Sequence, residues 1–306
     1  MSLTYQSVAA LVQAAQEHQC LLSHLVLKDQ AAQFEQAEEA IYERMRENYQ
    51  VMCDAITTGT DANLRSTSGL TGGDAYKLYA TREAGKSLTG TFMSGALYRA
   101  LAVAELNAAM GRVVAAPTAG SCGILPAAIA TMQSEYALRE EACVNALFTA
   151  SAIGLVIGNN ASLAGASGGC QAECGSASAM AAAAIVELAG GTPEMIDHAV
   201  AIALKNVLGL VCDPVAGLVE IPCIKRNAGG VASAFMAAEL ALAGIPSYIP
   251  ADDAILAMKQ VGDALPATLR ETAGGGLATT PTGQALNTKV FGDNITGSHC
   301  PHCPHA

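Results

Sequence analysis

The helix-forming parts of this sequence are built from unusually small side chains. Residues 178–191 read SAMAAAAIVELAGG, and aromatic residues make up only 4% of the chain, with no Trp. Alanine has the highest helix propensity of all residues, and the alternation of apolar and polar residues that marks a half-buried strand is nearly absent. Helices with such small side chains can pack at short separations. The sequence therefore predicts an all-α fold, a compact Ala/Gly-rich helical bundle.

Apolar residues at helical spacing place the expected helices along most of the chain. Thr192 and Thr280 each precede a proline, which is the pattern of an N-cap followed by proline in the first helical turn. We expect one helical domain over residues 1–292 and a flexible Cys/His-rich tail over residues 293–306, where prolines prevent a regular helix. The expected helices cover residues 28–58, 89–110, 122–133, 138–158, 171–190, 194–209, 223–244, 252–264 and 281–290.

Composition excludes several classes of function. A chain of 306 residues with 51% hydrophobic content can bury a large core, and a formal net charge of -11 argues against a nucleic-acid partner. The ten cysteines are too few for a disulfide scaffold, and the N-terminus lacks a basic start followed by an apolar run, so we expect a cytoplasmic protein with reduced thiols. The uncharged stretch between Glu141 and Glu173 contains polar residues, and we interpret it as a buried helix over 144–158 rather than a membrane span.

Several loops rich in Gly, Ser and Thr precede or join the expected helices. They lie at residues 65–77, 116–123, 165–175 and 271–283. Free backbone N–H groups at a helix N-terminus bind carboxylate or phosphate, so such loops suit a binding site. Their hydroxyl groups can bind a substrate or stabilise an oxyanion, or they can simply form turns and caps. The candidates are Ser68, Thr71, Ser121 and Ser167.

Three cysteines stand at loop–helix boundaries. Cys170 and Cys223 each begin an expected helix, where the positive end of the dipole stabilises a thiolate. Cys212 opens the loop that Cys223 closes, and two prolines and a glycine between them prevent a continuous helix. Three thiolates on separate loops can converge on one inorganic cluster. The alternative is that these are buried cysteines acting as small apolar residues, as we expect for Cys20, Cys53 and Cys143.

Four long motifs resemble one known family. The segments APTAGSCGILPAAI, SGGCQAECGSASAMAAAA, ALKNVLGLVCDPVAGLVEIPCIKRN and ETAGGGLATTPTG look like the alpha subunit of the iron–sulfur-dependent bacterial L-serine dehydratases. The resemblance runs from about Ser66 to Gly292. It implies that Cys170, Cys212 and Cys223 hold a [4Fe–4S] cluster whose open iron acts as a Lewis acid on L-serine, giving pyruvate and ammonia.

The resemblance also implies partners and leaves roles open. A beta subunit is expected, because the small α/β domain of the single-chain relatives is not in this sequence. The alternatives are an L-cysteine desulfidase of the same family and a non-catalytic iron–sulfur or zinc redox sensor. Cys174 departs from the family motif, and the role of Cys122 stays open. In the tail, Cys300 or Cys303 can cap the open iron, bind a separate metal with the neighbouring histidines, or do neither.

The general base is not assigned by the sequence. His198 is interpreted as an ordinary half-buried helical histidine. We predict that Lys205 and Ser121 take part in catalysis and that Asn206 binds substrate together with Ser68, Thr71 and Ser167. Cations beside the two cysteines of residues 209–230 can pair with a substrate carboxylate or with the charge of the cluster. These cations are Lys205, Lys225 and Arg226, for which a solvated side chain is the alternative.

Overall fold

The computed structural model describes residues 3–292, and within that range the chain forms thirteen α-helices and no β-strand. The predicted all-α fold is confirmed, whereas the predicted tail at 293–306 lies outside the described residues. The α-helices are α1 (Val8–Glu17), α2 (Leu22–Gln33), α3 (Glu38–Gly59), α4 (Asp74–Glu83), α5 (Gly90–Ala108), α6 (Ile124–Tyr136), α7 (Glu140–Asn160), α8 (Gly165–Gly168), α9 (Ser176–Leu188), α10 (Pro193–Lys205), α11 (Cys223–Leu242), α12 (Ala251–Ala264) and α13 (Pro281–Phe291). The shorter elements are the π-helical η1 (Gln171–Gly175) and the 3₁₀ turns η2 (Val215–Gly217), η3 (Ala267–Leu269) and η4 (Gly276–Thr279).

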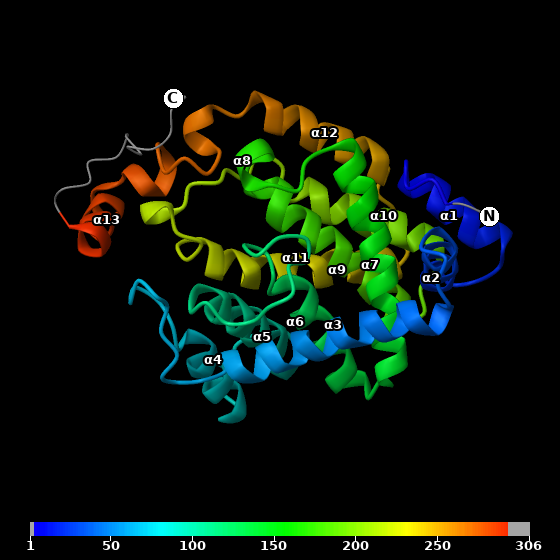
Figure 1. Ribbon diagram of the computed structural model, residues 1–306, viewed down its shortest axis with the longest axis horizontal. Helices are drawn as coiled ribbons and strands as arrows, with labels where there is room; N and C mark the ends of the chain where they lie inside the picture. Colours follow the sequence, from blue (N-terminus) through cyan, green and yellow to red (C-terminus); the bar gives the residue numbers. More distant parts are fainter. Residues whose placement is uncertain (1–2, 293–306) are drawn as a thin grey trace.

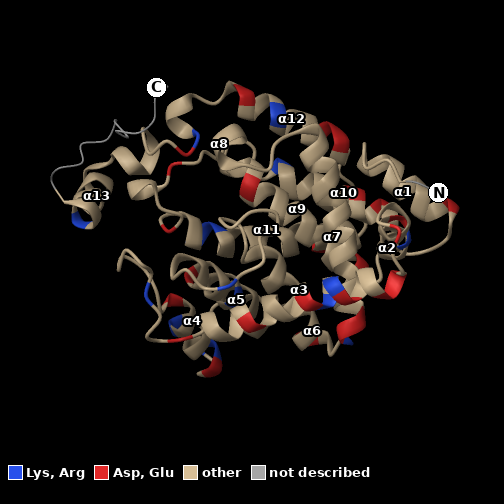
Figure 2. Ribbon diagram, viewed as in Figure 1, with Lys and Arg blue, Asp and Glu red and all other residues tan. Residues whose placement is uncertain are grey.

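Helix α9 forms the centre of the bundle (Figure 1). It packs against α6, α7, α10 and α11, and every residue from Ser176 to Glu187 is buried. Charged residues lie mainly on the outer helices, and α9 is nearly free of them (Figure 2). The alanine run therefore lets several helices approach one central helix closely, which is the packing that the small side chains predict.

The helix predicted over residues 28–58 is wrong as a single element. Helix α2 ends at Gln33, and Glu35 adopts a left-handed backbone conformation with φ of 52°, which breaks the helical path. Helix α3 then begins at Glu38 with two glutamates in its first turn, where the helix dipole favours negative charge. The spacing of apolar residues continues across this break, and for that reason it predicted one helix where the chain forms two. Helices α1 and α4 were not among the expected ranges.

Both predicted N-caps are confirmed. The Thr192 hydroxyl accepts the N–H of Met195 at 3.4 Å, and the Thr280 hydroxyl accepts the N–H of Gly283 at 3.1 Å. These caps fix the starts of α10 and α13, which flank the segments that carry the site described below.

In the part of the chain that the structure describes, one helix, α7, is long and apolar enough to cross a membrane. Of its apolar window, 67% is buried inside the protein, and the helix packs against α2, α3 and α9. The place of α7 in the core explains its apolar composition. The interpretation of residues 144–158 as a buried helix is therefore confirmed.

The contact between α3 and α5 gives a test of this close packing. Gly59 lies against the α5 backbone, and a Cβ added there would be 2.0 Å from the carbonyl oxygen of Ala102. We expect Gly59→Ala to lower the free energy of unfolding by at least about 2 kcal/mol, because two packed backbones must separate. In the matched control Gly229→Ala, the added Cβ meets no atom within 4 Å. That control should be neutral or stabilising by about 0.5–1 kcal/mol in denaturant unfolding, and equal effects of the two variants would contradict the packing argument.

Candidate active site

The three cysteines at loop–helix boundaries come from three separate elements. Cys170 precedes η1, Cys212 lies in the segment after α10, and Cys223 is the first residue of α11. Their residues are 1%, 3% and 6% exposed. Burial raises the pKa of the Cys223 thiol to about 12, and the charge of Cys170 acts in the same direction. Burial, followed by the charge of Cys170, also raises the pKa of Cys212. The fold therefore brings all three thiols within electrostatic range of one another.

The backbone of Cys212 is held on both sides by the chain that follows η3. The N–H of Cys212 donates to the carbonyl of Leu269 at 2.9 Å, and the N–H of Glu271 donates to the carbonyl of Cys212 at 2.8 Å. Gly165 packs directly against the thiol, because a Cβ there would lie 2.9 Å from Cys212 Sγ. Glu271 adopts φ of 64°, an uncommon conformation for a residue with a side chain. Leu269 of η3 and Glu271, the first residue of the ETAGGG motif, thus position the backbone of Cys212.

Arg226 links α11 to the same segment. Its guanidinium donates from Nη1 to the carbonyl of Val211 and from Nη2 to Oδ1 of Asp213, each at 2.8 Å. The two side chains of this ion pair are only 16% and 5% exposed. Arg226 therefore holds both neighbours of Cys212, and it brings a positive charge near Cys170. Its role as a charge partner of a cluster stays a prediction.

Cys174 lies with the thiols although it departs from the family motif. Its sulfur is 3.3 Å from that of Cys170, and the two share a hydrogen bond across η1. This hydrogen bond lowers the pKa of Cys170, and the charge of Arg226 acts in the same direction against the effect of burial. Cys122, by contrast, is buried in a separate apolar cluster with Ala55, Ile56, Val103 and Leu106.

Glu173 is a site residue that the sequence analysis missed. Thr118 donates its hydroxyl to Glu173 Oε1 at 2.5 Å, and the Thr118 and Ser121 hydroxyls are 3.0 Å apart. Burial raises the pKa of the Glu173 carboxyl, although the bond from Thr118 opposes this. The available signal was its position three residues after Cys170, in the same sequence motif. Histidines and lysines are the more familiar bases, and this carboxylate was not considered beside them.

A cavity of about 620 Å³ lies beside the first turn of α11, between the loop at residues 65–73 and the segment 220–225. The hydroxyls of Ser68 and Thr71 donate to the same oxygen, Oε2 of Glu220, at 3.0 and 2.8 Å. Glu220 is 5% exposed. Ser68 and Thr71 therefore attach their loop to the segment that leads into Cys223.

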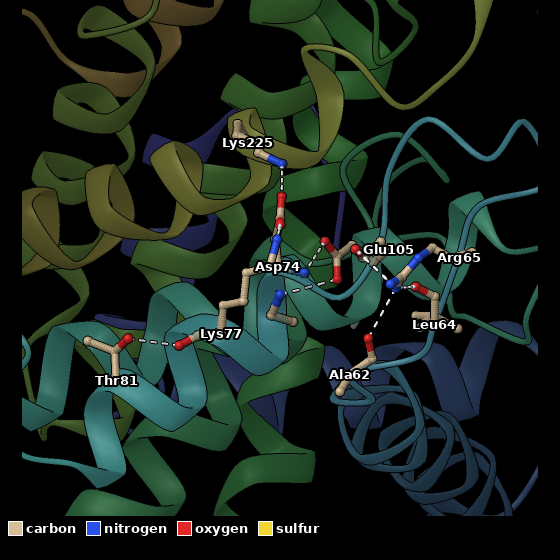
Figure 3. A network of polar contacts seen from close by, with 10 residues as sticks. Ala62, Leu64, Arg65, Asp74, Lys77, Thr81, Glu105 and Lys225 are labelled. Atoms are coloured by element: carbon tan, nitrogen blue, oxygen red, sulfur yellow. Dashed lines mark hydrogen bonds and ion pairs between the residues drawn. The ribbon is translucent and has the colours of Figure 1, made fainter.

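The wall of this cavity carries the polar network in Figure 3. Lys77 and Lys225 both contact the carboxylate of Asp74, at 2.8 and 2.5 Å. Glu105 accepts the backbone N–H groups of Asp74 and Ala75, at 3.0 and 3.2 Å, and so caps the start of α4. Lys225, expected as a charge partner, is thus paired with a carboxylate at the cavity wall.

Comparison with known proteins now decides the family. A family model described as "Serine dehydratase alpha chain" matches residues 17–278. The chain belongs to this family. It is 50% identical over 288 residues to "Probable L-serine dehydratase, alpha chain" of Bacillus subtilis, covering 94% of this chain and 96% of that protein. It is 44% identical over 276 residues to "L-serine dehydratase, alpha chain" of Peptoniphilus asaccharolyticus, covering 90% and 94%.

A longer relative is similar to this chain over only part of its own length. "L-serine dehydratase 2" of Escherichia coli is 39% identical over 293 residues, which cover 90% of this chain and 61% of that protein. The resemblance drawn from the four motifs is therefore confirmed as membership of the serine dehydratase alpha chain family.

In this member of the serine dehydratase alpha chain family, the contacts of the remaining predicted residues do not include the three thiols. Lys205 Nζ donates to the Ser247 hydroxyl at 2.6 Å, and Asn206 contacts the sulfur of Met236 at 3.9 Å. Ser167 is an exposed residue of α8. Their predicted roles, like that of Ser121 beside Thr118, stay predictions.

His198 lies on α10, with its Nδ1 3.8 Å from the Asp197 carboxylate. Among residues 3–292, no group of three or more His, Cys, Asp or Glu side chains is arranged to hold a single metal ion. A four-iron cluster makes a different demand, because each thiolate ligates a different iron.

Proposed function

We propose that this chain is the alpha subunit of an L-serine dehydratase, which converts L-serine to pyruvate and ammonia. The observation that carries the proposal is the convergence of Cys170, Cys212 and Cys223 from three elements into one buried region. The names of the relatives supply the substrate and the reaction.

We further propose that the three thiols hold a [4Fe–4S] cluster. Thiolates are the ligands that iron–sulfur clusters take in proteins. The donor set fits, because the three cysteines are buried, the backbone of Gly165 approaches Cys212 where a side chain would collide, and Arg226 offers a compensating charge. With three protein ligands, the cluster would supply an iron with an open position, which acts as a Lewis acid on the substrate hydroxyl.

The chain's own residues would bind and orient the substrate. Burial of the thiols keeps bulk water away from the reacting region and strengthens polar interactions there. The hydroxyls of Thr118 and Ser121 and the Glu173 carboxylate form a polar cluster before the start of α9. They can bind the ammonium or carboxylate group of an amino acid while Arg226 keeps the Cys212 segment in place.

We also propose that the chain works in the cytoplasm with a separate beta subunit. The two relatives named "alpha chain" support a partner chain. We assign to that chain the general base, which the sequence of this chain does not identify. An anaerobic assay of the cluster-reconstituted chain, alone and with its beta subunit, tests the proposal. We expect pyruvate from L-serine with the complete enzyme and little or none from the alpha chain alone. Sulfide from L-cysteine without pyruvate from serine would instead indicate a desulfidase, and turnover of neither would favour a redox sensor.

A further inference from the structure

Glu173 carries a carboxylate next to the candidate site. It follows Cys170 by three residues and lies in the π-helical η1, which Cys170 directly precedes. The charge of Glu173 influences the pKa of Cys170, Cys212 and Cys223 alike, raising each. The Glu173 carboxylate therefore lies within electrostatic range of all three thiols.

The orientation of this carboxylate is fixed by the loop at residues 116–123. The Thr118 hydroxyl donates to Glu173 Oε1. A Cβ on Gly120 would lie 2.5 Å from Glu173 Oε1, so the absence of a side chain lets the loop backbone approach the carboxylate. Glu173 is consequently held in place before any ligand arrives.

The charge around Glu173 favours one more cation. Glu271 lies close enough to repel it, and the Asp213 carboxylate is also in this region. Arg226 attracts Glu173 but is already paired with Asp213. Burial penalises the charged carboxylate, as the raised pKa of Glu173 reflects. A ligand with a compact positive group would relieve this penalty through charge-assisted hydrogen bonds.

We propose that Glu173 binds the α-ammonium group of the substrate and so selects amino acids over hydroxy acids that lack an amino group. The inference rests on the proposed function for the substrate class. It assigns to Glu173 a role in recognition, while the leaving hydroxyl is handled at the thiol site.

Glu173→Gln in the reconstituted holoenzyme tests this role. Glutamine keeps the shape of the side chain and an oxygen to accept the Thr118 hydroxyl, but it removes the charge. We expect the KM for L-serine to rise at least about 10-fold, the loss typical of a charge-assisted hydrogen bond. The dissociation constant of 3-hydroxypropionate, which is serine without its amino group, should stay the same or fall when measured by calorimetry. Iron content and visible absorption should match the unmodified enzyme.

Glu187→Gln is the matched control. Glu187 is a buried carboxylate, whereas Glu173 is partly buried, and it accepts the Thr149 hydroxyl at 2.6 Å and the Ser23 N–H at 3.2 Å, at the far end of α9. This variant should leave both constants unchanged. For Glu173→Gln, an unchanged KM, parallel weakening of serine and 3-hydroxypropionate, or a fall in kcat at constant KM would each overturn the inference. If the unmodified enzyme failed to turn over L-serine, that result would instead contradict the proposed function.

Discussion

Cys212→Ala is expected to eliminate bound iron and sulfide, the broad visible absorption of the cluster, and all lyase activity. Cys212 is one of three thiol ligands in the proposed site, and an alanine side chain has no atom that can ligate iron. The fold should persist, because the hydrogen bonds of residue 212 to Leu269 and Glu271 are made by the backbone. Iron and sulfide analysis, absorption spectra and the anaerobic serine assay measure the three losses, and circular dichroism measures the retained helix content.

Cys53→Ala is the control for this experiment. Cys53 is a partly buried cysteine of α3, beside Tyr49 and Cys143 rather than beside the proposed ligands. Its replacement should leave cluster content and activity intact. A Cys212→Ala protein that carries a full cluster and turns over serine would show that Cys212 is not a ligand.

The fold was predictable to the extent that local side-chain size and spacing determine it. The alanine run of α9 and the prolines after Thr192 and Thr280 are local signals, and the helices that they predict are present. The break at Glu35 was not predictable from apolar spacing, because a single left-handed residue interrupts the helix while the pattern of apolar side chains continues. Helix α4 was missed because Glu105, distant in sequence, caps its first turn.

The site was predictable where its chemistry is carried by residue type. Cysteines next to helix starts are recognisable in a sequence, and in the structure Cys170, Cys212 and Cys223 are buried within electrostatic range of one another, while their role as ligands stays a prediction. The position of Glu173 depends on Thr118, which is 55 residues away in the chain. The hold of the ETAGGG segment on Cys212 likewise depends on a tertiary contact. Such contacts leave no periodic signal, so they become visible only once the chain is folded.

Arg226→Met is expected to lower the free energy of unfolding of the cluster-free chain by about 3–5 kcal/mol, because it leaves a buried carboxylate without its cation. That carboxylate is Asp213, whose side chain is 5% exposed and also accepts the N–H of Leu277 at 2.8 Å. The adjacent cation gives a matched control, since Lys225→Met breaks an ion pair with Asp74 in which the side chains are 60% and 32% exposed. Surface pairs of this kind contribute at most about 1 kcal/mol.

A double-mutant cycle separates the ion pair from the packing of Arg226. In Arg226→Met with Asp213→Asn the buried charge is gone, and the asparagine oxygen can still accept the N–H of Leu277. We therefore expect the double variant to be more stable than Arg226→Met alone, with a coupling energy of about 1–3 kcal/mol in denaturant unfolding. Cluster content should not recover to the same degree, because a methionine side chain at this position cannot donate to the carbonyl of Val211 or offset the charge of the thiolates. Additive effects of the two substitutions would show that the ion pair contributes nothing, and Arg226 would then act on Cys212 through its contact with Val211 alone.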